Sequence, residues 1–198
     1  MTHNNSMTNN NEQYPSWAED QTIHAYFVVS GRLLAGEYPN STDLDRAPRK
    51  RQALLNAGVT SIVDLTEPRE PNLDGVRLEP YRDLLMEQAK DRGIKVKYAR
   101  FAIPDNSVIH DGGYDDILAY IQSELEAGEV IYLHCYGGKG RTGTVVGCWL
   151  IDNEGIDYDS AIRRLKELRR GSRKADHSVP DNHAQHDVLR RRAQRREA

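Results

Sequence analysis

Apolar positions along the chain fall into short runs and longer, helically spaced patterns. Five short segments predict strands, and they span residues 24–30, 31–36, 60–65, 95–101 and 130–133. The helical patterns and their stop signals predict helices at residues 41–58, 80–91, 114–127, 144–151 and 157–170, with a last one from about 181. Strands that alternate with helices predict an α/β fold with a central, mainly parallel sheet flanked by helices on both faces.

Three loops of this expected fold follow strands and should meet at one edge of the sheet. They comprise residues 66–76, residues 102–113 and the loop that begins at Cys135. In open α/β sheets the ligand crevice lies outside the carboxyl ends of the strands. We therefore expect any functional site on this edge.

The composition and the N-terminal residues limit the possible domain organisation and location of the protein. The polar, Asn-rich residues 1–15 predict a disordered tail, and residues 16–198 predict a single domain. No apolar run approaches the length of about 18 residues that a membrane helix needs, and the N-terminus lacks a signal-peptide pattern. Two cysteines make no disulfide framework, and a working thiolate requires a reducing compartment. We expect a cytoplasmic monomer.

Charge is distributed unevenly around a net value of −3. From Ala161 to the end there are 12 Lys and Arg residues against 5 Asp and Glu residues. Such a basic run can bind nucleic acid, but no aromatic residues are interleaved with it. We therefore expect no nucleic-acid partner and interpret residues 190–196 as the solvated face of a terminal helix.

The stretch with the most chemical information links the strand at 130–133 to the following apolar helix. Three glycines and a lysine lie between Cys135 and Arg141. Glycines let successive backbone N–H groups form an anion-binding nest, to which the helix N-terminus adds its dipole. A thiol there is expected to lose its proton readily, and the guanidinium can hold two oxygens of a tetrahedral anion. A nucleophile beneath a bound phosphate predicts phosphate transfer.

Other interpretations of this stretch fit less well. Gly138 to Gly143 also matches a dinucleotide-binding fingerprint, but that motif requires a second strand with an acidic residue further on, where a helix is expected. A Walker loop fails because Gly140, rather than Ser or Thr, follows Lys139. A buried structural cysteine remains the neutral alternative, and it is how we interpret Cys148.

The motif His134-Cys135, five residues, then Arg141-Thr142-Gly143 resembles the signature of the cysteine-dependent protein tyrosine phosphatases. Its glycine-rich core resembles most the small dual-specificity members, including the kinase-associated phosphatases. The resemblance implies that Cys135 and Arg141 are catalytic and that no metal or other cofactor takes part. It implies that phosphate is held by Tyr136, Gly137, Gly138, Lys139, Gly140 and Arg141.

Thiolate attack on a phosphomonoester also needs an acid that protonates the leaving oxygen. Asp105, in Ile103-Pro104-Asp105, lies 30 residues before Cys135 on a loop of the same rim, where the family resemblance places a general acid. Asp111 is the alternative, but it also has a capping role available ahead of the helix at Tyr114. We therefore expect Asp105 to be the acid.

Three further residues are candidates for supporting roles. The Thr142 hydroxyl can reach back to the Cys135 sulfur, or cap the helix, and His134 is expected to orient the loop. Gln185 resembles the family's late glutamine that places water, with an exposed helix glutamine as the alternative. Lys139 resembles a lysine of lipid-directed members.

A histidine cluster near the end of the chain raises the question of a metal site. It comprises His177, His183 and His186 with Asp181 and Asp187. No zinc-like spacing supports the cluster, so we expect no metal.

The sequence therefore predicts a phosphomonoester hydrolase that works through a cysteinyl-phosphate intermediate. We expect a phosphorylated protein or peptide substrate, with phosphotyrosine or dual specificity. The alternatives are a phosphoinositide phosphatase and a catalytically weak phosphate-binding module.

Overall fold

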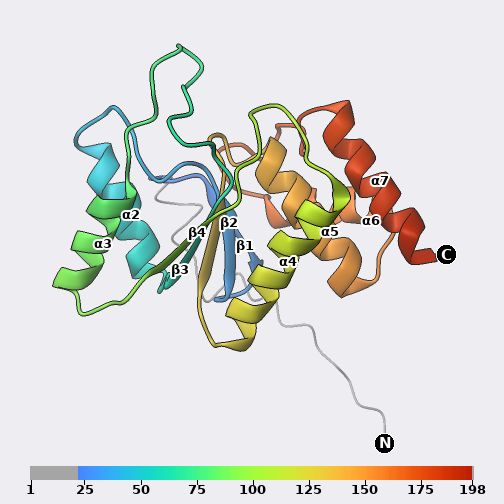
Figure 1. The fold of residues 1–198 in the computed structure, drawn as a ribbon, viewed down its shortest axis with the longest axis horizontal. Helices are drawn as coiled ribbons and strands as arrows, with labels where there is room; N and C mark the ends of the chain where they lie inside the picture. The colour runs from blue at the N-terminus through green and yellow to red at the C-terminus, as the bar shows by residue number, and fades with distance from the viewer. Residues whose placement is uncertain (1–21, 198) are drawn as a thin grey trace, which may run out of the picture.

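A five-stranded sheet runs through the middle of the molecule in the computed structural model, which describes residues 22–197 (Figure 1). The strand order is β1-β2-β5-β3-β4. β1 (Ala25–Val29) pairs antiparallel with β2 (Leu33–Gly36). The other pairings are parallel and involve β2, β5 (Ile131–His134), β3 (Ser61–Asp64) and β4 (Lys97–Arg100). The expected mainly parallel sheet is confirmed.

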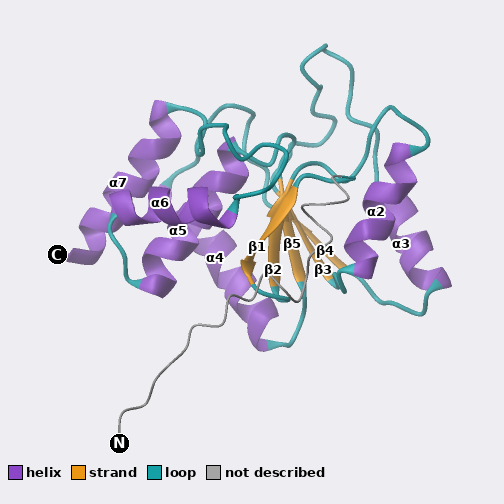
Figure 2. Cartoon of the chain, turned by 180° about the vertical axis from the view of Figure 1, so that it is seen from behind, coloured by secondary structure: helices purple, strands orange, loops and turns teal. Residues whose placement is uncertain are grey.

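Helices cover both faces of this sheet (Figure 2). On one face lie α2 (Arg46–Asn56) and α3 (Arg82–Asp91). The other face carries α4 (Asp111–Glu126), α5 (Gly140–Glu154), α6 (Tyr158–Leu168) and α7 (His183–Glu197). Each layer has its own hydrophobic core. β5 is buried along its whole length between them, so the residue that follows it starts from a rigid position.

Helix boundaries differ from expectation by up to five residues, at the start of α2, and the difference that bears on the site is the start of α4. The helix begins at Asp111, three residues before the expected Tyr114, and the preceding loop is correspondingly short. His110 is the N-cap, and its Nδ1 accepts a hydrogen bond of 3.1 Å from the Gly113 N–H. The sequence offered Asp111 as the cap of this helix, but Asp111 lies in its first turn. A carboxylate there interacts favourably with the helix dipole.

Two glycines on α5 bring the C-terminal segment close to this helix. A Cβ atom on Gly143 would lie 2.3 Å from Val179, and one on Gly147 would lie 2.6 Å from Leu189. A larger residue at either position would require Val179 or Leu189 to shift. The segment that enters α7 is therefore held against the N-terminal half of α5.

The basic C-terminal stretch is largely occupied by ion pairs. Arg191 and Arg195 pair with Asp111, at 3.2 and 3.7 Å, and Arg192 pairs with Asp115 and Asp152. These contacts fasten α7 to α4 and α5. The expected disordered tail, residues 1–15, lies outside the described residues. Within residues 22–197, every helix is too short or too polar to cross a membrane.

Candidate active site

The loop after β5 carries Cys135 at its start and folds back against the end of β2. Cys135 is 2% exposed. Gly138 has a φ of +70°, and a Cβ atom there would lie 2.5 Å from the backbone carbon of Gly36. The Tyr38 N–H donates to the Tyr136 carbonyl at 2.9 Å. This close backbone packing requires glycine at position 138 and fixes the loop shape.

Arg141 returns to the site from the first turn of α5, where it is 2% exposed. Its guanidinium donates two hydrogen bonds to the Glu70 carboxylate, at 2.6 and 2.7 Å. It donates further bonds to the Ile103 carbonyl, at 3.0 Å, and to Asp105 Oδ1, at 2.8 Å. These contacts use both N–H groups of Nη1 and both of Nη2, which leaves Nε as its one N–H group without a partner among residues 22–197.

The ionisation of Arg141 reflects these contacts. Burial alone would lower its pKa, but the hydrogen bonds with Glu70 and the neighbouring Cys135, Glu70 and Asp105 charges raise that pKa above its ordinary value. The guanidinium therefore keeps its positive charge.

Glu70 had not been singled out in the sequence. It lies in the polar 66–76 loop that follows β3. Its backbone N–H donates to the Glu67 carbonyl, and its carbonyl accepts from the Leu78 N–H. The sequence signal that could have pointed to Glu70 is its place in the loop after β3, the strand that pairs with β5. The rule that loops at the carboxyl ends of parallel strands converge brings the 66–76 loop to the site, but it does not select Glu70 among that loop's acidic residues.

The two candidate acids lie in different surroundings. Asp105 contacts Arg141, its side chain is 41% exposed, and it lines the same cavity as Cys135. Asp111 instead forms ion pairs with two arginines of α7, Arg191 and Arg195. The structure thus brings Asp105, and not Asp111, to the cysteine loop.

His134 is fully buried behind the nucleophile position. Its Nδ1 lies 3.2 Å from the Cys135 carbonyl, and its Nε2 lies 2.6 Å from the Tyr81 hydroxyl. Burial lowers the pKa of His134, although Asp64 counteracts this, so the ring is neutral. Because a carbonyl can only accept, Nδ1 carries the proton and Nε2 accepts from Tyr81. The ring therefore ties the loop backbone to α3.

Thr142 and Gln185 occupy unexpected environments. The Thr142 hydroxyl is buried and has no hydrogen-bond partner among the described residues, neither the Cys135 sulfur nor a helix N–H. Gln185 is 1% exposed, so the alternative of an exposed helix glutamine is wrong. Its amide lies against Gly140, donates to the Ser107 carbonyl and accepts from the Asp181 N–H. Its burial follows from the packing of α7 on α5.

A cavity of about 650 Å³ opens above the loop. Its lining includes the nucleophile candidate and residues from each of the neighbouring loops: Glu37, Lys50, Arg77, Asp105, Cys135, Lys139, Arg141, Lys174, His177, Asp181 and Gln185. Lys139 forms an ion pair of 3.1 Å with Asp181. Its charge is therefore partly compensated, which weakens the argument that it selects lipids.

The second cysteine and the histidine cluster show no chemistry of their own. Cys148 is fully buried in the core, and burial raises the pKa of its thiol to about 12. His186 is bonded to the Tyr158 hydroxyl at 3.0 Å. Over residues 22–197, no three His, Cys, Asp or Glu side chains come together in a way that would hold a metal ion.

Comparisons with known proteins place the chain in a family. Residues 24–196 match the family model described as "Swiss Army Knife protein, DSP-PTPase phosphatase domain". The chain is 32% identical to the putative tyrosine phosphatase 067L of Invertebrate iridescent virus 3, over 64% of the chain and 45% of that protein. It is 26% identical to the phosphatidylglycerophosphate phosphatase PTPMT2 of Arabidopsis thaliana, over 69% of the chain and 52% of that protein.

A solved structure shares the fold. The active form of Tk-PTP superposes with a TM-score of 0.62 at 24% identity, over 87% of this chain and 97% of that one. The chain spans about half the length of the two curated relatives. Because the family model covers almost all of the described residues, the chain belongs to the dual-specificity group of the protein tyrosine phosphatases that this model describes.

Proposed function

We propose that this domain hydrolyses phosphomonoesters through a cysteinyl-phosphate intermediate. The observation that carries the proposal is the position of Arg141, which Glu70 holds beside Cys135 and which also contacts Asp105. A nucleophile, an anion-binding fork and a carboxylic acid thus lie around one cavity. These are the three groups that phosphate transfer to a thiolate requires.

Substrate docking changes one contact of Arg141. The phosphate displaces Asp105 from Nη2, and the guanidinium then presents Nε and Nη2 to two phosphate oxygens while Glu70 keeps the other side. A bidentate contact of this kind orients a tetrahedral anion. Once released from Arg141, the Asp105 carboxylate takes up a proton from solvent and lies close to the leaving oxygen.

The reaction then takes two steps. The Cys135 thiolate attacks phosphorus, the ester P–O bond breaks, and Asp105 donates its proton to the departing oxygen. In the second step water attacks phosphorus, gives a proton to Asp105, and the S–P bond breaks to restore the thiolate. Gln185, buried beside Gly140, orients this water.

Trapping the intermediate tests the mechanism. Wild-type protein is mixed with an aryl phosphate that is labelled in its phosphate group and is then quenched in acid. The peptide that contains Cys135 is expected to carry the label. The Cys135→Ser variant should show neither label nor turnover. Turnover that survives in that variant would overturn the mechanism, and tight phosphate binding with no labelled protein would favour the phosphate-binding module instead.

For the substrate, the viral relative favours phosphotyrosine and the Arabidopsis relative favours a lipid phosphate. We favour a phosphorylated protein or peptide, because the Lys139 charge is paired with Asp181. Rates on a panel of phosphopeptides and phosphoinositides decide between them. Because a thiolate nucleophile needs a reducing compartment, we place the protein in the cytoplasm.

A further inference from the structure

The cysteine loop contains a peptide unit that can turn easily, the one between Gly137 and Gly138. Glycine adopts positive and negative φ values with similar ease, and Gly138 has a φ of +70°. Packing against Gly36 fixes where Gly138 lies, but a glycine on each side gives the peptide unit between them little steric resistance to rotation. Because the C=O and N–H groups of a trans peptide point in opposite directions, the direction of the Gly137 carbonyl decides where the Gly138 N–H points.

The N–H groups of this loop are not used by the backbone of the protein. Within residues 22–197, none of the N–H groups of residues 136–140 donates to a backbone carbonyl. Successive N–H groups of this kind form a nest that binds an anion. A reversed Gly137–Gly138 peptide would replace one of these donors with a carbonyl oxygen, which carries partial negative charge. The loop therefore needs a contact that holds this peptide in one orientation.

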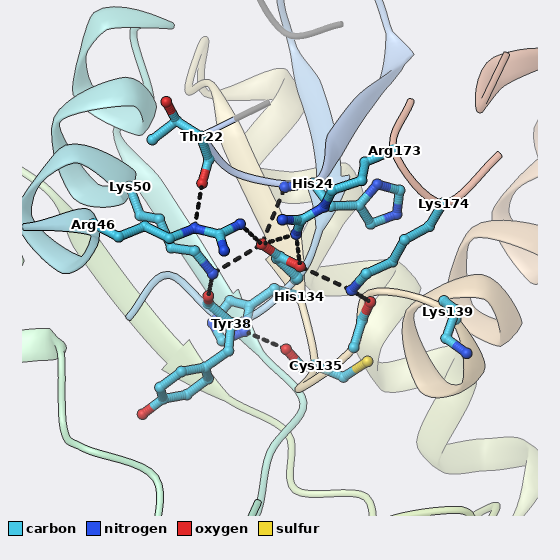
Figure 3. Close-up of polar contacts among 12 residues, drawn as sticks. Thr22, His24, Tyr38, Arg46, Lys50, His134, Cys135, Lys139, Arg173 and Lys174 are labelled. Atoms are coloured by element: carbon cyan, nitrogen blue, oxygen red, sulfur yellow. Dashed lines mark hydrogen bonds and ion pairs between the residues drawn. The ribbon is translucent and has the colours of Figure 1, made fainter. Parts of the chain in front are cut away.

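Lys174 makes that contact from a distant part of the chain. Its Nζ donates to the Gly137 carbonyl at 2.9 Å and to the Glu37 carboxylate at 2.8 Å. Figure 3 shows the Lys174 side chain reaching toward the loop that begins at Cys135. Within residues 22–197, no other hydrogen bond is made to the Gly137 carbonyl.

Lys174 is itself held at its side chain and at its backbone. Glu37 directly follows β2, is buried, and also forms an ion pair of 2.8 Å with Lys50. The backbone carbonyl of Lys174 accepts a hydrogen bond from Arg169, the buried C-cap residue of α6. The same guanidinium donates to the His177 carbonyl at 2.9 Å. These contacts fix the Lys174 ammonium group relative to the loop.

We propose that Lys174 is a positioning residue for the phosphate-binding loop: by holding the Gly137 carbonyl, it keeps the Gly138 N–H turned toward the phosphate. This rests on the proposed function, in which the loop binds the phosphate that is transferred. Donors that are already oriented stabilise an anion more than donors that must first reorient. Lys174 also lines the same cavity, so the experiment has to separate the effect of its charge from its effect on the loop.

Two variants of the full-length protein make this separation. Lys174→Met removes the bond to the Gly137 carbonyl and one positive charge beside Glu37. Arg173→Met removes one positive charge from the same carboxylate, to which Arg173 donates at 2.8 and 2.9 Å, and it removes no bond to the loop. It is therefore the matched control. Circular dichroism checks that both variants are folded.

Crystals of the wild type and both variants, grown without phosphate or sulfate, give the direct readout. We expect one orientation of the Gly137–Gly138 peptide in the wild type and in Arg173→Met. In Lys174→Met the peptide should be reversed or divided between two orientations. A single, unchanged orientation in Lys174→Met would overturn the proposal.

Calorimetry with inorganic phosphate gives the second readout. Lys174→Met should bind phosphate about tenfold or more weakly than the wild type, because a charge-assisted hydrogen bond contributes about tenfold or more. Arg173→Met should stay within about threefold of the wild type, since a partly exposed charge that is already paired contributes little. Equal losses in the two variants would show a general effect of charge and would overturn the role of the bond to the loop.

Both readouts use the resting loop and phosphate binding rather than turnover, so they separate this proposal from the proposed function. Label trapped on Cys135, together with an unchanged peptide in Lys174→Met, would leave the proposed function standing and remove the role of Lys174. A wild type that binds phosphate but never carries the label would overturn the proposed function, and the peptide orientation would still decide the role of Lys174.

Discussion

The Glu70 carboxylate grips the Arg141 guanidinium through two hydrogen bonds, of 2.6 and 2.7 Å, and both side chains are 2% exposed. Removing one partner of a buried pair leaves an uncompensated charge. The pair also sets the plane of the guanidinium and hence the direction of its Nε and Nη2 donors. Glu70 thus sets the orientation of Arg141, although the two residues lie far apart in the sequence.

Glu70→Gln is expected to lower kcat/KM for an aryl phosphate by about tenfold to a hundredfold, because small displacements of a positioning group cost that much. The amide replaces one acceptor with a donor that opposes Arg141. Glu67→Gln, on the same loop and exposed, is the control and should behave as wild type. Steady-state kinetics with circular dichroism as a folding check make the comparison, and equal kinetics for both variants would contradict the role of Glu70.

Asp105→Asn should damage hydrolysis of a phosphopeptide far more than that of a nitrophenyl phosphate. General acid catalysis contributes about 10²–10⁴-fold, and a good leaving group has little need of it. The basic limb of the pH–rate profile should flatten. Phosphate should also inhibit the variant more strongly, since Asp105 no longer competes as an anion for Arg141 Nη2.

Asp111→Asn, which alters a carboxylate paired with α7, is the matched control for this variant. It should retain the basic limb and the wild-type dependence on leaving group. If Asp111→Asn removed the basic limb and Asp105→Asn kept it, the acid would be assigned to the wrong residue.

Iodoacetamide should alkylate Cys135 and not Cys148. Cys135 lines the cavity beside Arg141, whereas burial raises the pKa of the Cys148 thiol to about 12, so that thiol stays protonated and inaccessible at neutral pH. Peptide mass spectrometry should find one label, and inorganic phosphate should slow its addition. Labelling of Cys148 at a similar rate would show that the core opens readily.

Glu37→Gln should destabilise the protein at neutral pH and less so in acid. Burial alone would raise the pKa of Glu37, but Lys50 and Lys174 hold it below its ordinary range. The contribution of such a lowered carboxyl is fully present above the unfolded pKa of about 4.3 and is lost as the pH falls through the folded value. We expect a loss of about 3–5 kcal/mol at pH 7.

Denaturant unfolding of both proteins at neutral pH and below about pH 4 measures this difference. Glu167→Gln alters an exposed carboxylate that lies 3.7 Å from Arg164 and should change the free energy of unfolding by less than about 1 kcal/mol. A difference between wild type and Glu37→Gln that stays constant into acid would contradict the ionised state of Glu37 in the fold.

The parts of the site that lie close in sequence were predictable. Cys135 and Arg141 occupy one loop between a strand and a helix, so residue spacing alone brings them together. The alternation of strands and helices also predicted the parallel sheet, and with it the rim that Asp105 shares. The first inference depends on residue spacing within one loop, and the second depends on local periodicity, which the chain displays clearly.

Contacts between distant segments were not predictable in the same way. Glu70 meets Arg141 only because the 66–76 loop folds over the site, and that loop has no periodic pattern. Gln185 is buried because α7 packs on the glycines of α5. The start of α4 was predicted too late because its N-cap is His110, and histidine is not a preferred N-cap residue. The sequence offered Asp111 for that role.

The glycines at positions 143 and 147 bear on the order in which this protein can assemble during its synthesis. The helix that begins at the cysteine loop is made before Val179 and Leu189, the residues that fill its two gaps. Domains form as units while the ribosome adds about 5–20 residues per second. A nascent chain that has only just exposed Cys135 therefore still lacks the support of its own loop, and the site matures only after the α7 segment has emerged.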